Sequence, residues 1–324
     1  MSVRVLAPLA LGLAALASGF VRTTDRESKA CLAWRDREVR WVVNPARPAT
    51  SPSCDGDGAL AAVRAAFAAW PNATAAGAGA PCTDLRLVDG GVTSTASSGY
   101  SRGGDNENLV VFRQGWCSDR VPVDDGCWDD GTCADEWGCF ADGAEGDRHV
   151  IAVTTVTYES DSGTILDADI EVADWDGRGG RLSTPPTNGW YFTCNDDVPQ
   201  CASYGEDGCA FIDLRNTLTH EVGHLVGLAH VARTSANRSI TMYPDTGPLD
   251  VSKRDLSADD VAGVCTIYPT GAETPSCGGE RDEGCGGQTA GEPRSGGAAG
   301  VGLALAVLAL RRLAPWRAWR VRSS

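Results

Sequence analysis

Lysine is nearly absent from this 324-residue chain, histidine occurs four times and methionine only twice. The 43 acidic residues outnumber the 28 basic ones and give a net charge of −15, so no basic face is available to neutralise phosphates. This balance argues against nucleic acid as a partner. None of the thirteen cysteines is spaced Cys-x-x-Cys, a pattern that favours disulfides over a metal cluster.

The first residues have the pattern of an export signal. A short positive start, Met1–Arg4, precedes the apolar run Val5–Leu16 and the small-x-small site Ala15-Leu16-Ala17. This predicts a secretory signal peptide over residues 1–17, which is too short to span a membrane comfortably. Export implies an oxidising destination, in agreement with disulfides. The following segment, residues 18–38, is too short for a large folded pro-domain.

Residues 220–230 match the pattern H-E-x-x-H-x-x-G-x-x-H at every fixed position. His220 and His224 lie one turn apart on the same helix face and can direct their imidazoles at one ion. Glu221 can reach a water on that ion, and Gly227 tolerates the turn that brings His230 round as a third ligand. Three histidines and a water make a catalytic zinc site. The alternative, a buried helix with incidental histidines, accounts poorly for so complete a match.

Hydrophobic spacing predicts an alternation of strands and helices around this motif. Period-two and short apolar segments indicate strands, and apolar residues three and four apart indicate helices. The expected strands cover residues 39–43, 85–88, 109–112, 149–158 and 165–172, and the last two form a hairpin. The expected helices cover 59–70, a segment from 211 through the motif, and a last helix after a capping box at Ser257.

Residues 115–147 are rich in aspartate and glycine and contain four cysteines, which predicts a disulfide-stapled insert. Its acidic side chains offer hard oxygen ligands for calcium. No twelve-residue calcium-loop spacing is present, so a solvated acidic loop is the stronger interpretation and calcium the weaker one. The acidic residues in question are Asp124, Asp125, Asp129 and Asp130.

The C-terminal part divides into three segments. Residues 270–295 have the composition of a flexible linker, and residues 296–310 are apolar but shorter than the roughly twenty expected for a full membrane span. Residues 311–324 contain five arginines and no acid, which predicts that this tail stays on the cytoplasmic side of a membrane.

These motifs together resemble those of the metzincin zinc endopeptidases, and most closely the matrixin-like branch. The zinc motif is followed in the right order by a Met-turn candidate, Met242-Tyr243-Pro244, and by the segment 256–261 that opens the last helix. The similarity covers residues 39–269 as one protease domain. It implies an α+β fold, with a twisted mixed sheet, an active-site helix, a C-terminal helix and disulfide-rich loop insertions.

The resemblance also implies roles for individual residues. His220, His224 and His230 are the expected zinc ligands, Glu221 the general base, and Met242 the floor beneath the metal. The strand 165–172 is expected to pair with extended substrate, which gives the substrate-binding candidates Ile165, Leu166, Ala168 and Tyr243.

Two features depart from or add to this pattern. The cysteine-switch peptide of many matrixin zymogens is missing, so latency would need another device; Cys31 is a candidate, although a structural disulfide is the simpler role for it. Separately, the tail resembles the tripartite C-terminal sorting tags of bacterial surface proteins, of the MYXO-CTERM type. Such a tag implies processing near Cys277 or Cys285 and contact with the membrane before processing.

The sequence thus predicts an exported, monomeric zinc metalloendopeptidase, secreted or displayed on the cell surface, that acts on polypeptides. Zinc would lower the pKa of a water towards about 7, and Glu221 would take its proton. Two alternatives are a zinc-containing adhesion module whose cleft the insert blocks, and a zinc hydrolase of small esters or amides. An adhesion module would not need Glu221, and an extended strand beside the motif suits polypeptide better than a small ester.

Overall fold

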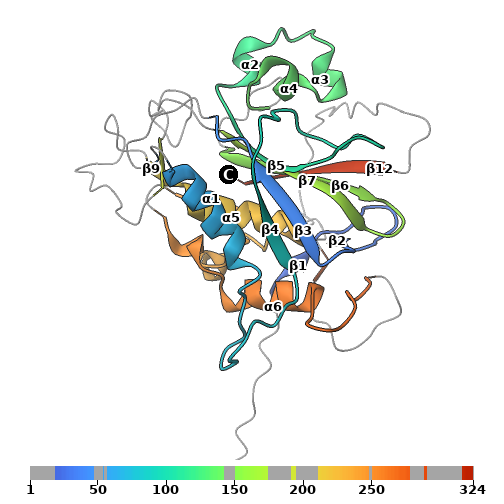
Figure 1. Cartoon of the computed structure of the whole chain (residues 1–324), viewed down its shortest axis with the longest axis vertical. Coiled ribbons are helices and arrows are strands. Elements are labelled where there is room, and N and C mark those ends of the chain that lie inside the picture. The colour runs from blue at the N-terminus through green and yellow to red at the C-terminus, as the bar shows by residue number, and fades with distance from the viewer. Residues whose placement is uncertain are drawn as a thin grey trace, which may run out of the picture.

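The computed structural model describes residues 19–46, 54, 57–141, 150–173, 191–194, 211–247 and 250–277, together with the backbone of 288–289 and 316–323. Its centre is a mixed sheet with the strand order β12-β6-β7-β5-β3-β4, and β2 pairs with the start of β7 (Figure 1). The strands are β2 (Ala33–Trp34), β3 (Glu38–Val43), β4 (Arg86–Val92), β5 (Asn108–Arg113), β6 (Ala152–Glu159), β7 (Thr164–Ala173) and β12 (Trp316–Ser323).

The sheet is parallel from β4 to β7 and antiparallel beyond it. β4, β3, β5 and β7 run in one direction, whereas β6 is the antiparallel partner of β7. β6 and β7 form the hairpin that the polar turn at residues 160–163 predicts. The mixed sheet that the sequence predicts is therefore present.

Two helices cover one face of this sheet, α1 (Gly58–Ala69) and α5 (Leu214–Leu225) (Figure 1). Val63 and Phe67, four residues apart in α1, are both fully buried, as the periodicity of the segment predicts. Phe67 stacks on Trp41 of β3 with 4.1 Å between ring centroids. Trp70, at the end of α1, donates from its indole Nε1 to the carbonyl oxygen of Thr219 in α5 at 3.0 Å. These contacts fix α5 against the sheet.

The last helix, α6 (Ala258–Ile267), begins at the capping box that the sequence predicts. The Ser257 hydroxyl accepts from the Asp260 backbone N–H, and the Asp260 carboxylate accepts from the Ser257 N–H. The remaining short elements are β1 (Val21–Arg22), β8 (Tyr191–Thr193), β9 (Phe211–Asp213), β10 (Leu228–Ala229), β11 (Gln288–Thr289) and the 3-10 turns η2 (Ser235–Asn237) and η3 (Ser252–Arg254).

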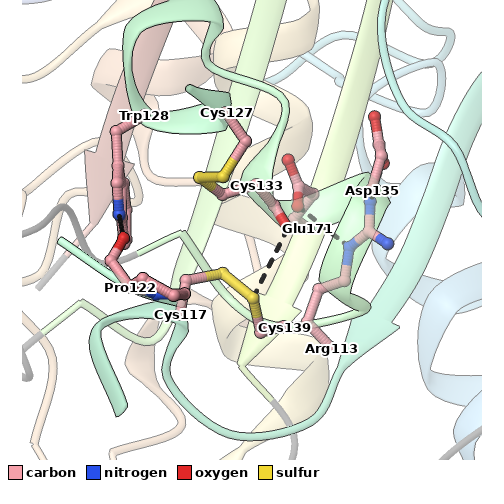
Figure 2. The surroundings of a disulfide bond; sticks show 9 residues. All are labelled: Arg113, Cys117, Pro122, Cys127, Trp128, Cys133, Asp135, Cys139 and Glu171. Atoms are coloured by element: carbon pink, nitrogen blue, oxygen red, sulfur yellow. Dashed lines mark hydrogen bonds and ion pairs between the residues drawn. A yellow bond between two sulfur atoms is a disulfide. The ribbon is translucent and has the colours of Figure 1, made fainter. Parts of the chain in front are cut away.

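The cysteine-rich insert folds into three short helices at one end of the sheet, whereas α5 lies on its face (Figure 1). These are α2 (Cys117–Arg120), α3 (Cys127–Asp130) and α4 (Cys133–Trp137), stapled by the disulfides Cys117–Cys139 and Cys127–Cys133 (Figure 2).

A single buried arginine attaches this insert to the sheet. Arg113 donates from Nε to the Glu171 carboxylate of β7 at 3.0 Å and from a terminal nitrogen to Asp135 of α4 at 2.5 Å (Figure 2). The neck of the insert is closed by backbone hydrogen bonds between Gly115, Cys117 and Phe140. The Ser98 backbone N–H also donates to Asp135, at 3.0 Å, so the insert is held to β5, to β7 and to the loop between β4 and β5.

Three further disulfides join segments that are distant in sequence: Cys31–Cys277, Cys54–Cys194 and Cys82–Cys265. The disulfides predicted from the cysteine pattern are therefore present, and Cys31 has the structural role rather than a part in latency. Cys201, Cys209 and Cys285 lie outside the described residues.

Part of the C-terminal tail belongs to the sheet, because residues 316–323 form β12, which pairs antiparallel with β6. The sorting tag and its contact with a membrane before processing stay predictions. In the part of the chain that the structure describes, no helix is long and apolar enough to cross a bilayer. The signal segment 1–17 and the apolar segment 296–310 lie outside the described residues.

Candidate metal centre and active site

Helix α5 is held firmly at both ends. Asp213 caps its first turn by accepting from the Asn216 N–H at 2.6 Å, and Arg254 forms a two-pronged ion pair with the same carboxylate, at 2.6 and 3.0 Å. At the other end, Gly227 adopts a φ of +93°, and a Cβ there would lie 2.4 Å from the Leu32 carbonyl oxygen. Only glycine fits this turn, which confirms the prediction made for Gly227.

The turn brings the three motif histidines together. The Nε2 atoms of His220, His224 and His230 lie 3.1 Å from one another in all three pairs. His220 and His224 are buried, and His230 is half-buried. Among the described residues, they form the one group of three or more histidine, cysteine or acidic side chains that converges closely enough to hold a metal ion.

Backbone carbonyls fix the tautomers of two of these rings. The His220 Nδ1 lies 2.5 Å from the Thr241 carbonyl oxygen, and the His224 Nδ1 lies 2.8 Å from that of Leu228. Because a carbonyl oxygen only accepts, each Nδ1 carries the proton and each Nε2 presents a lone pair. Burial, together with the neighbouring imidazoles, lowers the pKa of His220 and of His224 well below the usual range. Burial also lowers the pKa of His230, to about 4, so all three rings are neutral at pH 7.

This donor set fits a zinc ion. Lone pairs of neutral rings that face one another at 3.1 Å repel unless a cation lies among them. A tetrahedral ion with bonds of about 2.0–2.1 Å to nitrogen separates its ligand nitrogens by roughly 3.3 Å, close to the observed spacing. The Nδ1–H···O=C bonds are the outer contacts that orient metal-binding histidines.

Glu221 is held by a residue that the sequence analysis missed. The Thr154 hydroxyl of β6 lies 2.6 Å from the Glu221 Oε2 and 3.1 Å from its backbone oxygen, and both side chains are fully buried. Thr154 donates to the carboxylate and thereby fixes its orientation next to His220. The two residues are 67 positions apart, so no local pattern in the sequence indicates this contact.

Met242 lies directly against α5 and is nearly fully buried. A Cβ on Gly223 would come within 2.2 Å of the Met242 sulfur, so glycine is the residue that lets the methionine pack there. Asp260 holds the backbone of this turn, because its carboxylate accepts from the N–H groups of Thr241 at 2.8 Å and Met242 at 3.2 Å. Thr241 in turn accepts from His220. Asp260 of α6 therefore helps to position His220, because Thr241 is hydrogen-bonded to both residues.

Replacing Gly223 by alanine is expected to destabilise the protein by about 1–3 kcal/mol, because the added methyl overlaps the Met242 sulfur. Alanine normally stabilises a helix interior relative to glycine. A loss of unfolding free energy in Gly223→Ala would therefore show that the overlap with Met242 outweighs the gain in helix propensity. The matched control is Gly126→Ala, at a position with helical φ and no atom within 4 Å of the added Cβ. Urea unfolding of both variants is the measurement, and a Gly223→Ala protein as stable as Gly126→Ala would contradict this packing.

The strand expected to pair with substrate lies inside the sheet. β7 is paired with β6 along one edge, and along the other β2 pairs with residues 164–165 and β5 with residues 170–173. Between them the Asn108 side chain accepts from the Ala168 N–H at 2.9 Å, and Ile165 and Ala168 are buried. An extended peptide cannot add to a strand whose edges are occupied. This corrects the expectation that Ile165, Leu166 and Ala168 pair with substrate.

Tyr243, the other substrate-binding candidate, lies next to a buried lysine. The Lys253 ammonium donates to the carbonyl oxygens of Tyr243, at 2.9 Å, and Asp245, and it lies 5.6 Å from the Tyr243 ring centre. Burial lowers the pKa of Lys253 to about 8. A narrow pocket next to the zinc motif is lined by Ile151, Asn216, Thr217, His220, Pro244, Thr246 and Lys253.

The acidic residues of the insert do not converge on a common point. Asp124, Asp125, Asp129 and Asp130 form no group of ligands close enough to hold an ion in the described part of the chain, and Asp125 instead accepts from the Cys127 backbone N–H at 2.9 Å. The calcium site considered for these residues is not supported.

The chain matches one protein family over most of its catalytic region. The matrixin family model matches residues 97–269, which is more than half of the 324 residues. The chain belongs to the matrixin family. The matched region contains α5, Met242 and α6, and hence every residue of the centre described above.

Individual matrixin relatives match shorter stretches. The chain is 47% identical to Metalloendoproteinase 1-MMP of Arabidopsis thaliana over 57 residues, which are 18% of this chain and 14% of that protein. It is 31% identical to Metalloendoproteinase 1 of Glycine max over 126 residues, 35% of this chain and 38% of that protein. It is 42% identical to Matrix metalloproteinase-27 of Tupaia belangeri over 57 residues, 18% of this chain and 10% of that protein. The chain thus spans well under half the length of these relatives.

Proposed function

We propose that this matrixin is a zinc metalloendopeptidase in which His220, His224 and His230 bind the metal and Glu221 is the general base. The observation that carries the proposal is the buried Glu221 carboxylate, which follows the first histidine and is oriented by Thr154. A module that only binds zinc needs three imidazoles but no such carboxylate.

The chain's own residues supply positioning and proton transfer. Zinc, when bound, polarises the scissile carbonyl and makes a nearby water more acidic. Glu221 accepts the proton of the attacking water and returns it to the leaving amine. Thr154 donates to the carboxylate and keeps it in one orientation, while Thr241 and Leu228 hold the first two imidazoles as the tautomers that bind metal.

An extended polypeptide is the substrate that suits this site. β6 contacts α5 and contributes Thr154, and its edge that faces away from β7 is paired with β12, so a substrate would take this edge in place of residues 316–323. A peptide added antiparallel along this edge would present successive bonds to the carboxylate.

We also propose that the protein is exported as a monomer and is secreted or displayed at the cell surface. The signal pattern at residues 1–17 and the five disulfides of the described residues support export. The sorting-tag resemblance of the tail predicts its removal. The mass of the exported protein tests both points, because a signal or an Arg311–Ser324 tail retained in the mature chain would contradict them.

A digest of an unfolded-peptide library distinguishes the candidate activities. The endopeptidase predicts internal cuts with a sequence preference, which chelation abolishes and zinc restores. An adhesion module predicts no cleavage, and a small-molecule hydrolase predicts turnover of short acyl compounds only. Intact peptides after incubation with the zinc-loaded protein would overturn the proposal.

A further inference from the structure

The C-terminal strand covers the edge of the sheet nearest the candidate active site. β12 pairs antiparallel with β6 in an unbroken register from Trp316 opposite Glu159 to Ser323 opposite Ala152 (Figure 1). The pairing includes all eight residues of each strand. β6 thus has β7 on one side and the protein's own C-terminus on the other.

The position of β12 along β6 brings it past the catalytic carboxylate. Val321 is the register partner of Thr154, whose hydroxyl donates to Glu221. Adjacent strands lie about 4.8 Å apart, so the β12 backbone runs one strand spacing from the backbone that positions Glu221. β12 also comes within 8 Å of α5, measured between Cα atoms. Its backbone therefore lies beside the two elements that build the site.

A substrate and β12 need the same hydrogen-bonding groups. An extended peptide binds a sheet by pairing with the unused N–H and C=O groups of an edge strand. β7 offers no such edge, and β4, at the other end of the sheet, is separated from β6 by three strands. While β12 is in place, the outward groups of β6 are used internally. Binding of a peptide beside Glu221 therefore requires β12 to leave.

We infer that residues 316–323 are an intramolecular inhibitor that occupies the substrate edge of β6, an inference that rests on the endopeptidase function proposed above. Charge supports the docking, because residues 311–324 carry five arginines and no acid in a chain of net charge −15. Pairing of the tail with β6 thereby keeps the enzyme latent. Proteolytic loss of the tail frees the edge and activates the enzyme.

The test compares the full chain with a chain that ends at Pro315, both loaded with zinc. The shortened chain is expected to have a KM at least about tenfold lower on a peptide substrate and an unchanged kcat, as for relief of competitive inhibition. A synthetic peptide of residues 316–323 should inhibit the shortened chain competitively, and a shuffled peptide of the same composition should inhibit it much less. A full-length variant with both Ala318→Pro and Trp319→Pro keeps length and charge and removes two successive N–H groups, one of which faces β6, so it should resemble the shortened chain.

Hydrogen exchange gives a readout that does not depend on catalysis. The β6 amides that face β12 are expected to be protected in the full chain and to exchange at least about tenfold faster in the shortened chain, even in an inactive Glu221→Gln background. Equal KM values and equal exchange in the two chains would overturn the inference. If neither chain cleaves any peptide but the exchange difference is present, the pairing stands and the proposed catalytic function fails.

Discussion

A Glu221→Gln variant is expected to hydrolyse peptides at least about a thousandfold more slowly than the wild type, while binding zinc with the same stoichiometry. General-base catalysis contributes about 10²–10⁴ to the rate, and an amide cannot accept the proton of the attacking water. The amide oxygen still accepts from the Thr154 hydroxyl, so the side chain keeps its place and the change is confined to the chemistry. The measurement is kcat/KM on a single fluorogenic peptide, with zinc determined on the same sample.

Glu159→Gln is the matched control for this variant. It makes the same chemical change on the same strand as Thr154, but at the far end of β6, where Glu159 accepts from the Ser162 hydroxyl. Its activity should equal that of the wild type. If Glu221→Gln cleaved the peptide at the same rate as Glu159→Gln, Glu221 would not be the general base. The adhesion module and the small-molecule hydrolase would then again be candidate functions.

An Asp260→Ala variant is expected to lose about 3–5 kcal/mol of unfolding free energy. The buried carboxylate accepts from the backbone N–H groups of Thr241, Met242 and Ser257, and alanine leaves these donors without their acceptor. Each such loss costs about 1–3 kcal/mol. Because Thr241 also orients the His220 ring, zinc affinity should fall about 10- to 100-fold, as when an outer contact of a metal ligand is removed. Urea unfolding and a competitive zinc titration measure the two effects.

Asp259→Ala is the appropriate comparison, because it removes the neighbouring charge from the same first turn of α6. Asp259 accepts from the Gly19 N–H at 2.6 Å, whereas the N–H groups of Thr241 and Met242 donate to Asp260. Zinc affinity should therefore be unchanged in this variant. Equal zinc affinities in the two alanine variants would show that Asp260 does not position the metal site through the Met242 turn.

The sequence predicted the local parts of the site well, because their causes are local. The four-residue spacing of His220 and His224 places both on one helix face, and Gly227 permits the turn that returns His230 to them. The capping box at Ser257 likewise depends on residues three positions apart. Each of these features follows from short-range backbone geometry, and the structure shows each of them.

The features that the sequence did not predict depend on sheet order. β6 and β7 are both strand-forming segments rich in β-branched residues, so their composition does not show that β7 lies between β6 and β5 or that β6 pairs with the tail. The contact of Thr154 with Glu221 depends on that order, as does the pairing of the tail with β6. Disulfide partners such as Cys31 and Cys277, 246 residues apart, are similarly fixed by the fold rather than by spacing.

X-ray absorption at the zinc edge of the purified protein shows which atoms bind the metal. If the three histidines hold it, the spectrum shows one zinc per chain with three imidazole nitrogens at about 2.0–2.1 Å and no sulfur ligand, and a His224→Ala variant loses this signal. Zinc bound through sulfur, or a signal that His224→Ala leaves unchanged, would show that the three histidines are not the metal site.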